Sequence, residues 1–156
     1  MANFNFPGLK LTAEGQKYVN ELNKLANMEI CVGFQAGDGS YENGTDIVDI
    51  ASYNEFGTST IPARPFMQQS WENHESELQS ACEEALASVS NGGGAQEACD
   101  KIGAIGVKLV QQEIVDGGFV PNAPSTVLKK GSAQPLIDTG TMRQSVHYVV
   151  RGAGSS

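Results

Sequence analysis

Carboxylates in the glycine-rich stretch 35–45 are the first residues whose types suggest chemistry. Asp38, Glu42 and Asp46 follow one another closely enough to suggest a calcium site. Their order lacks the turn glycine and the final bidentate glutamate of an EF-hand loop, so a solvated turn is predicted instead. The catalytic alternative is a metal-dependent hydrolase that uses Asp38, Glu42 and His74, although no metal-ligand spacing supports it.

The run Asp138-Thr139-Gly140 has the letters of the aspartic-protease motif. That chemistry needs an apolar strand that delivers the aspartate and a second carboxylate beside it. Residues 135–137 partly meet the first need, but a short helix capped by Asp138 or Thr139 is predicted to follow. The second carboxylate would have to come from a symmetric dimer. The motif therefore favours a structural role over proteolysis.

Cys31, Cys82 and Cys99 have neither a Cys-x-x-Cys spacing nor a nearby histidine pair. They are predicted to be small buried hydrophobic residues in a reducing compartment, not a disulfide frame or a zinc site. The glycines 92–94 lack the lysine and hydroxyl residue of a phosphate-binding loop. His74 lies in an acidic helical run without a second ligand and is predicted to be a surface residue. The sequence thus predicts no metal and no cofactor.

The composition is that of a globular protein with an acidic balance. The 156 residues carry a net charge of −8, which argues against a general nucleic-acid binder. The acidity indicates either solubility or a surface that DNA passes without binding. No apolar run approaches a membrane span, and the first residues lack a signal peptide, so synthesis in the cytoplasm is expected. One domain over residues 1–156, with flexible ends at 1–8 and 152–156, is the expected organisation.

The elements that position these residues follow from hydrophobic spacing. Helices are predicted over residues 9–27, 47–56, 66–89 and 95–116, with Thr12 and Asp46 as N-caps of the first two. The third helix is predicted to bury a stripe formed by Phe66, Trp71, Leu78, Cys82, Ala85 and Val89. In the fourth, Gly103 and Gly106 are predicted to permit close approach to another backbone.

Alternating β-branched residues predict strands over 28–34 and 146–151. Residues 119–134 have no clear period and predict an extended excursion that carries the adjacent pair Lys129 and Lys130. The predicted fold class is α+β: a small antiparallel sheet packed against two long helices, with extended loops that reach neighbouring subunits. Because an isolated pair of strands is marginal in water, further strands or neighbouring subunits must complete the sheet.

Residues 53–66, here called the strap, connect the second and third predicted helices. Gly57 is expected just past a helix end in a left-handed conformation, and Pro62 and Pro65 stiffen the connection. Anchoring in the core is predicted for Phe56, Ile61 and Phe66. A charge-assisted pair between Glu55 and Arg64 is predicted to hold the strap together.

Two sequence blocks carry a family resemblance. The strap sequence Tyr-Asn-Glu-Phe-Gly-Thr followed by Ile-Pro-Ala-Arg-Pro-Phe resembles the signature of the tail-component, or tail-completion, proteins of tailed bacteriophages. The later block, residues 135–145, resembles the proline-leucine, aspartate-threonine-glycine and serine block of the same family. The likeness extends from about residue 30 to residue 150. Neither block is catalytic, so the resemblance implies no enzyme activity.

The resemblance implies a virion protein that is assembled in the host cytoplasm and forms a homo-oligomeric ring at the neck or tail end. The implied partners are the head connector or adaptor and the tail terminator or tail tube proteins, with DNA passing through the lumen and no membrane contact. A cytoplasmic assembly adaptor that never enters the particle is a further alternative. The residues expected to hold the fold or the subunit contact are Glu55, Phe56, Gly57, Arg64, Pro65, Phe66, Asp138, Thr139, Gly140 and Arg143.

Overall fold

The computed structural model describes residues 2–122, 124 and 140–154. In chain order the described elements are α1 (Ala13–Ala26), β1 (Met28–Gly33), α2 (Ile47–Phe56), α3 (Phe66–Asn73), α4 (Glu75–Ser90), α5 (Ala95–Asp116), α7 (Thr141–Ser145) and β2 (His147–Gly152). Helices and a small antiparallel sheet of two strands make the fold α+β, as predicted. The chain divides into two compact units, and each is described by itself below.

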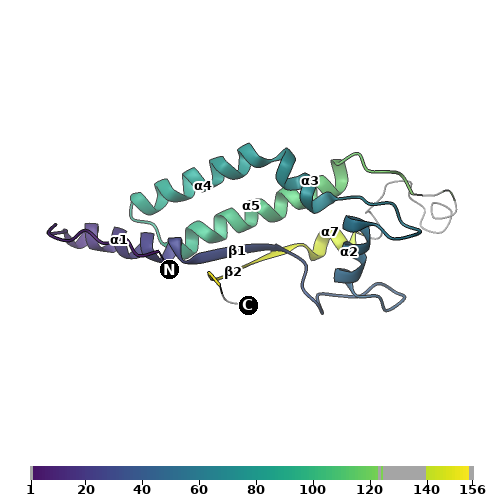
Figure 1. Cartoon of the computed structure of the whole chain (residues 1–156), viewed down its shortest axis with the longest axis horizontal. Helices are drawn as coiled ribbons and strands as arrows, with labels where there is room; N and C mark the ends of the chain where they lie inside the picture. Colours follow the sequence, from purple (N-terminus) through teal and green to yellow (C-terminus); the bar gives the residue numbers. More distant parts are fainter. Residues whose placement is uncertain (1, 123, 125–139, 155–156) are drawn as a thin grey trace. The chain divides into compact units, whose positions relative to one another are not determined.

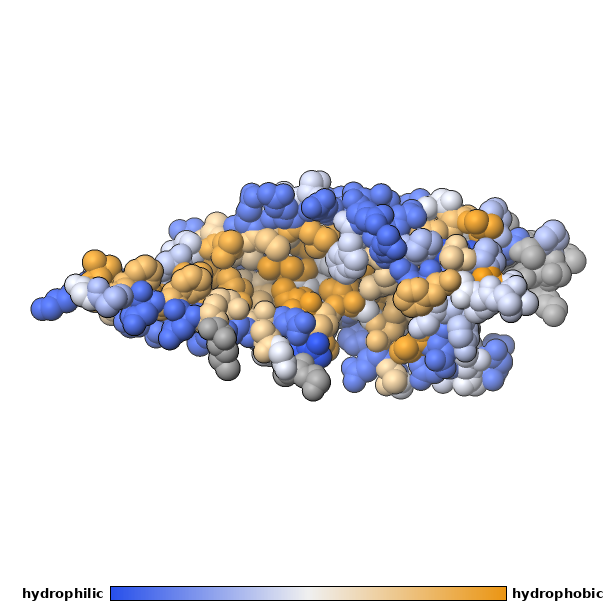
Figure 2. Space-filling view, viewed as in Figure 1, coloured by the Kyte–Doolittle hydropathy of each residue, from blue (hydrophilic) through white to orange (hydrophobic). Residues whose placement is uncertain are grey.

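The first unit, here called the sheet unit, comprises Met1–Val32, Ser76–Gly106 and Tyr148–Ser156. It contains α1, most of α4, the first part of α5 and the paired strands (Figure 1). Hydrophilic side chains line the outer edge of α4, and hydrophobic side chains gather beneath it over α5 (Figure 2). The core here consists of small and branched side chains on these helices, namely Ala85, Val89 and Ala98 with Leu25 and Ile102 packed against them.

The sheet packs on α5 at a glycine. A Cβ added to Gly103 would come within 2.4 Å of the Tyr148 ring of β2. The Tyr148 hydroxyl donates to Asp100 Oδ1 at 3.1 Å. A close approach at Gly103 is therefore present, but an aromatic side chain makes it and not the backbone that was predicted.

The second unit, here called the strap unit, comprises Gly33–Glu75 and Val107–His147. Helix α2 packs against α3 and against α7. Phe66, at the start of α3, is fully buried and meets the Phe34 ring edge-on, with ring centroids 6.0 Å apart. Buried side chains from the second part of α5, namely Leu109, Val110 and Ile114, extend this core.

The predicted helix over residues 66–89 is wrong, because the chain leaves helical geometry at His74 (φ −119°, ψ 21°) and forms α3 and α4 instead. The predicted stripe is only partly confirmed: Phe66, Ala85 and Val89 are buried, whereas Trp71 and Leu78 are half-buried. Ala81 is buried and Cys82 is exposed. Of the three cysteines predicted to be buried, only Cys99 is; Cys31 is half-buried.

Other local predictions are confirmed. Thr12 Oγ1 accepts a hydrogen bond from Gly15 N at the start of α1, and Asp46 Oδ1 accepts one from Val48 N at the start of α2. Helix α5 has the predicted bounds. Within the described residues, no helix is long and apolar enough to cross a membrane.

Candidate functional site

Within the strap, the first residue after helix α2 is a glycine whose backbone conformation other residues do not adopt easily. Gly57 has φ 74° and ψ 171°, and an added Cβ would lie 2.8 Å from Ala63 N and 3.0 Å from Ile61 O. The positive φ was predicted, but the ψ value is extended and differs from the left-handed helical conformation expected at a helix end. This region is essentially restricted to glycine, so the close contact with Ala63 also depends on the missing side chain.

The tip of the strap is stabilised by its own hydrogen bonds. Thr58 N donates to Ile61 O at 2.8 Å, and Thr58 Oγ1 accepts from Thr60 N and Ile61 N at 3.2 and 3.0 Å. A threonine hydroxyl that bonds nearby amides in this way stabilises a turn. The strap is thus an ordered turn, as Pro62 and Pro65 predicted.

Arg64 joins the strap to the chain after α5. Its side chain is 6% exposed and donates to Val120 O at 2.9 Å, to Asn54 Oδ1 at 3.2 Å, and to Pro121 O and Asn122 Oδ1 at 3.4 Å each. Burial lowers the pKa of the guanidinium, which nevertheless stays charged at neutral pH. One buried arginine thereby holds together α2, the strap and the segment 120–122.

Glu55 does not pair with Arg64, so that prediction is wrong. Its two carboxylate oxygens accept hydrogen bonds from Met67 N at 2.8 Å and Gln68 N at 3.1 Å. These are early amides of α3, whose N-cap residue Pro65 makes no side-chain cap. A carboxylate at a helix N-terminus satisfies free amides and is favoured by the helix dipole. Glu55 therefore caps α3 from the neighbouring helix.

The three predicted anchors of the strap differ in their surroundings. Phe66 is buried in the core, and Ile61 is half-buried. Phe56 is 80% exposed, the most exposed large hydrophobic side chain in the described part of the chain. Tyr53, one turn earlier on the same helix, is also exposed. The prediction that Phe56 anchors the strap is therefore wrong, since its side chain points into solvent.

The second sequence block is described only from Gly140 onward, because Asp138 and Thr139 lie outside the described residues. Gly140 has φ 73° and ψ 0°, and it occupies the N-cap position of α7. The cap predicted at Asp138 or Thr139 falls outside the described residues, and the N-cap position itself is Gly140. Arg143 is exposed, and its carbonyl accepts from Gln111 Nε2 at 3.0 Å. Because α7 packs against α2, parts of the two blocks lie together within the strap unit.

A polar cluster that surrounds one buried carboxylate, that of Glu113, was not predicted from the sequence. Glu113 is 4% exposed; its Oε1 accepts from Gln69 Nε2 at 2.6 Å and Asn73 Nδ2 at 3.0 Å, and its Oε2 lies 3.3 Å from His74 Nε2. The prediction that His74 is a surface residue is therefore wrong, because its side chain is largely buried. The available signal was position: Glu113 follows Leu109 by four residues and shares its helix face. Gln69 also donates to Gly117 O, so the cluster ties α3 to the end of α5.

The residues of the hydrolase alternative do not form a common centre in the described structure. Asp38 Oδ2 lies 3.1 Å from His147 Nδ1 and accepts from Gln35 N, whereas His74 faces Glu113. Among residues 2–122, 124 and 140–154, no group of three or more histidine, cysteine or carboxylate side chains could hold a metal ion.

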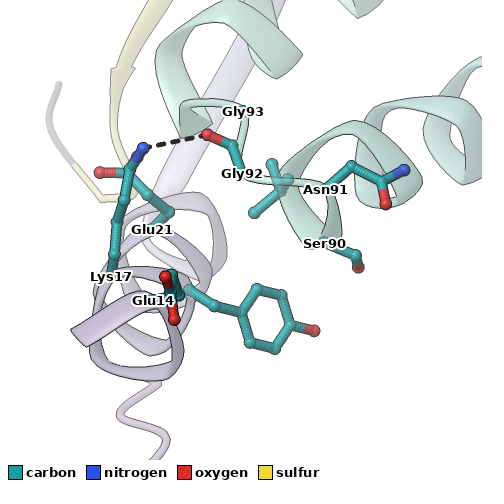
Figure 3. Close-up of a pocket in the computed structure, with 9 residues that line it drawn as sticks. Glu14, Lys17, Glu21, Ser90, Asn91, Gly92 and Gly93 are labelled. Carbon is teal, nitrogen blue, oxygen red and sulfur yellow. Dashed lines mark hydrogen bonds between the residues drawn. The ribbon is translucent and has the colours of Figure 1, made fainter. Parts of the chain in front are cut away.

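A shallow cavity of about 320 Å³ lies in the sheet unit between α1 and the turn that joins α4 to α5 (Figure 3). Two of its charged groups, Lys17 and Glu21, are already used within the chain. Lys17 Nζ donates to Gly92 O at 3.1 Å, just past the end of α4, and Glu21 Oε2 accepts from Ala95 N at 2.8 Å at the start of α5. The bond to Ala95 and the adjacent Lys24 lower the pKa of Glu21. A cation at a helix C-terminus and an anion at an N-terminus both suit the helix dipoles, so α1 clamps the turn electrostatically.

Four residues of the strap thus have a role inside the described fold. Glu55 caps a helix and Gly57 permits a close backbone contact. Arg64 joins three segments and Phe66 fills the core. Phe56 is the exception, since its side chain is largely solvent-exposed. Comparisons of the chain with protein-family models, with curated proteins and with solved structures found no match.

Proposed function

We propose that this chain is a structural protein of a tailed-bacteriophage particle, and that it forms a homo-oligomeric ring at the head–tail joint or the tail end. The observation that carries the proposal is Phe56, which the strap holds at 80% exposure. A large apolar side chain on a rigid connection is typical of an interaction site. In the proposed ring it inserts into a pocket of the next subunit.

Further features support a contact at this part of the strap unit. Tyr53 and Val120 are also exposed, and Val120 is joined through Arg64 to the helix that carries Tyr53 and Phe56. The family resemblance rests on the strap and on the block that includes Thr141–Ser145, and α7 packs on α2. We expect the excursion over 119–134, most of which lies outside the described residues, to take part in the contact with a neighbouring subunit. A ring needs heterologous contacts, in which one face of a subunit docks on a different face of the next.

The paired strands support assembly as well. In the described structure β1 and β2 pair only with each other and pack on α5, so both are edge strands to which a further strand could be added. Strands of a neighbouring subunit would extend the sheet. The net charge of −8 suits a lumen through which DNA passes without being held, because basic walls would bind phosphates and slow passage. The ring then contacts the head connector or adaptor on one side and tail terminator or tail tube proteins on the other.

The test is the assembly state of a Phe56→Ser variant, measured by size-exclusion chromatography with light scattering and by negative-stain electron microscopy. We expect the wild-type chain to form closed rings and the variant to form smaller species that keep the wild-type far-UV circular dichroism spectrum. Leu86→Ser is the matched control, since Leu86 is an exposed apolar residue of the sheet unit. It should assemble like the wild type.

A wild-type chain that remains monomeric at high concentration would contradict the ring. A Phe56→Ser variant that assembles normally would contradict the role of Phe56 in the subunit contact. Mass spectrometry of purified phage particles separates a virion protein from an assembly adaptor. The chain should be present in stoichiometric amounts in the particle; its absence there would favour the adaptor.

A further inference from the structure

Two asparagines in the sequence are followed directly by glycine, namely Asn43 and Asn91. Asparagine is one of the residues whose side chain decomposes without an enzyme. The reaction begins when the backbone nitrogen of the next residue attacks the side-chain amide carbon, and a glycine in that place has no Cβ to hinder the approach. Both asparagines are exposed, so water can reach them. The sequence context alone therefore favours reaction at either site, and the structure distinguishes the two.

Asn43 lies at the tip of a hairpin in the strap unit, which Tyr41 N closes by donating to Thr45 O at 3.0 Å. At the tip, Thr45 N donates to Asn43 Oδ1 at 3.1 Å. A side chain that bonds the amide two residues ahead folds back over the peptide between them. The side-chain carbon of Asn43 is thereby held close to the Gly44 nitrogen that would attack it.

The same hydrogen bond makes the Asn43 amide easier to attack. When a nitrogen adds to an amide carbon, negative charge develops on the amide oxygen. Thr45 N already donates to that oxygen in the folded chain, so a donor is in place where the charge appears. One contact opposes the reaction, because Gly44 N donates to Tyr41 O at 2.8 Å and this bond has to open first. It lies in an exposed turn, where local opening costs least.

Asn91 is held differently, at the end of α4. Its backbone N donates to Ala87 O at 3.0 Å. Gly92 N, the nitrogen that would attack, donates to Val89 O at 3.1 Å, and Lys17 Nζ donates to Gly92 O at 3.1 Å. The Asn91 side chain points away from the bond to Lys17 (Figure 3). Within the part of the chain that the structure describes, no donor bonds its side-chain oxygen, so its backbone is fixed and its amide is not activated.

We propose that Asn43 is a site of spontaneous deamidation in the folded protein and that the fold protects Asn91. Gly44 N forms a bond to Asn43 Cγ and releases its proton to water. The Cγ–Nδ2 bond then breaks, and Nδ2 leaves with one added proton as ammonia. Water opens the resulting cyclic imide at either carbonyl, which yields aspartate or isoaspartate. The overall change consumes one water and releases one ammonia, with no oxidation or reduction.

Both products alter the loop that carries Asn43. Each introduces a new carboxylate next to Glu42, in a loop that already contains Asp38 and Asp46. Isoaspartate also adds a methylene to the main chain, because the backbone then runs through the former side chain. The added length shifts Thr45 relative to Tyr41, whose hydrogen bond closes the hairpin. Deamidation thus increases the negative charge of the loop, and its isoaspartate product opens the tip of the hairpin.

The test is to incubate the purified full chain at mildly alkaline pH and to follow both asparagines by peptide mapping with mass spectrometry. We expect Asn43 to be lost roughly tenfold faster than Asn91 in the folded chain, because a placed donor to a developing oxyanion can change a rate by that much or more. The same measurement in urea removes the structure, and the two rates should then become similar. Electron-transfer fragmentation distinguishes isoaspartate from aspartate in each peptide.

Asn43→Gln and Asn91→Gln are the matched variants, since glutamine would have to react through a larger and slower-forming ring. Isoaspartate, detected by enzymatic methylation, should be largely lost in Asn43→Gln and should persist in Asn91→Gln. Equal loss of both asparagines in the folded chain, or faster loss of Asn91, would overturn the proposal. So would an Asn43 that is stable in the folded chain but reacts in urea, because the hairpin would then protect it. None of these outcomes depends on whether the chain forms a ring.

Discussion

In each unit, a glutamate from an earlier helix caps a later helix that is preceded by a residue without a capping side chain. In the sheet unit, Glu21 of α1 caps α5, which follows Gly94. In the strap unit, Glu55 of α2 caps α3, which follows Pro65. Glu21 accepts one amide and also binds Lys24, whereas Glu55 accepts two amides.

The difference reflects what else holds each unit. Helix α5 has 22 residues and a face of buried apolar side chains, so its cap is one contribution among many. Helix α3 has 8 residues, and a short helix depends more on its ends. The strap unit has an apolar core around Phe66, and in addition side chains that bond backbone groups join its segments, as Arg64, Glu55 and Gln69 do. We therefore expect polar substitutions to be costly in the strap unit, and steric ones to be costly where the sheet packs on α5.

The largest effect is expected for Arg64→Met. Methionine fills much of the volume but leaves the carbonyls of Val120 and Pro121 without their donor. We expect the free energy of unfolding to fall by about 3 kcal/mol, since the buried Arg64 loses several hydrogen bonds and each bond made by a charged group contributes roughly 1.5–3 kcal/mol. Urea denaturation measures this. Arg143→Met, at an exposed position, should change stability by less than about 0.5 kcal/mol. Equal effects at both positions would contradict the role of Arg64.

The next effect tests packing in the sheet unit. Gly103→Ala should lower the free energy of unfolding by about 1–3 kcal/mol, because the new Cβ overlaps the Tyr148 ring. At the exposed neighbour Ala104, the reverse change Ala104→Gly should cost about 1 kcal/mol through helix propensity alone. At position 103 glycine is thus expected to be more stable than alanine, and at position 104 alanine more stable than glycine. A more stable Gly103→Ala variant would show that Tyr148 can move aside.

Glu55→Gln addresses the cap in the strap unit. The amide removes the charge and can accept only one of the two bonds, so we expect a loss of about 1 kcal/mol. Hydrogen exchange at Met67 and Gln68 should become faster than in the wild type. Glu72→Gln is the control, because Glu72 is exposed and bonds only the side chain of Gln68. Unchanged exchange in Glu55→Gln would contradict the cap.

The smallest effect is expected for Glu21→Gln, and it should depend on pH. The pKa of Glu21 is lowered in the folded chain, so its contribution to stability is present above the unfolded pKa and is lost as pH falls through the folded pKa. Wild type and variant should therefore differ at pH 7 and converge in strong acid. The comparison is made by urea denaturation at a series of pH values. A difference that persists in acid would mean that charge is not the cause.

Local chemistry was predicted well where a residue and its partner are close in sequence. Thr12 and Asp46 cap their helices because a short polar side chain reaches the amides of the next turn. The bounds of α5 and the need for glycine at position 103 also followed from spacing alone. Pairing of Glu55 with Arg64 was predicted from opposite charge and proximity. It was wrong because both groups have better partners that only the folded chain supplies.

The sequence by itself determined the α+β class, the order of most elements, the ordered strap and the glycine that follows helix α2. These features depend on hydrophobic period, helix caps and backbone geometry. Tertiary structure alone decided the break at His74, the burial of Glu113, the exposure of Phe56 and the binding of the N-terminal segment by Asn23 and Asn27. Each of these depends on groups separated by many residues. Hydrophobic spacing records which face of a helix is buried, but it does not record which distant donor meets a given acceptor.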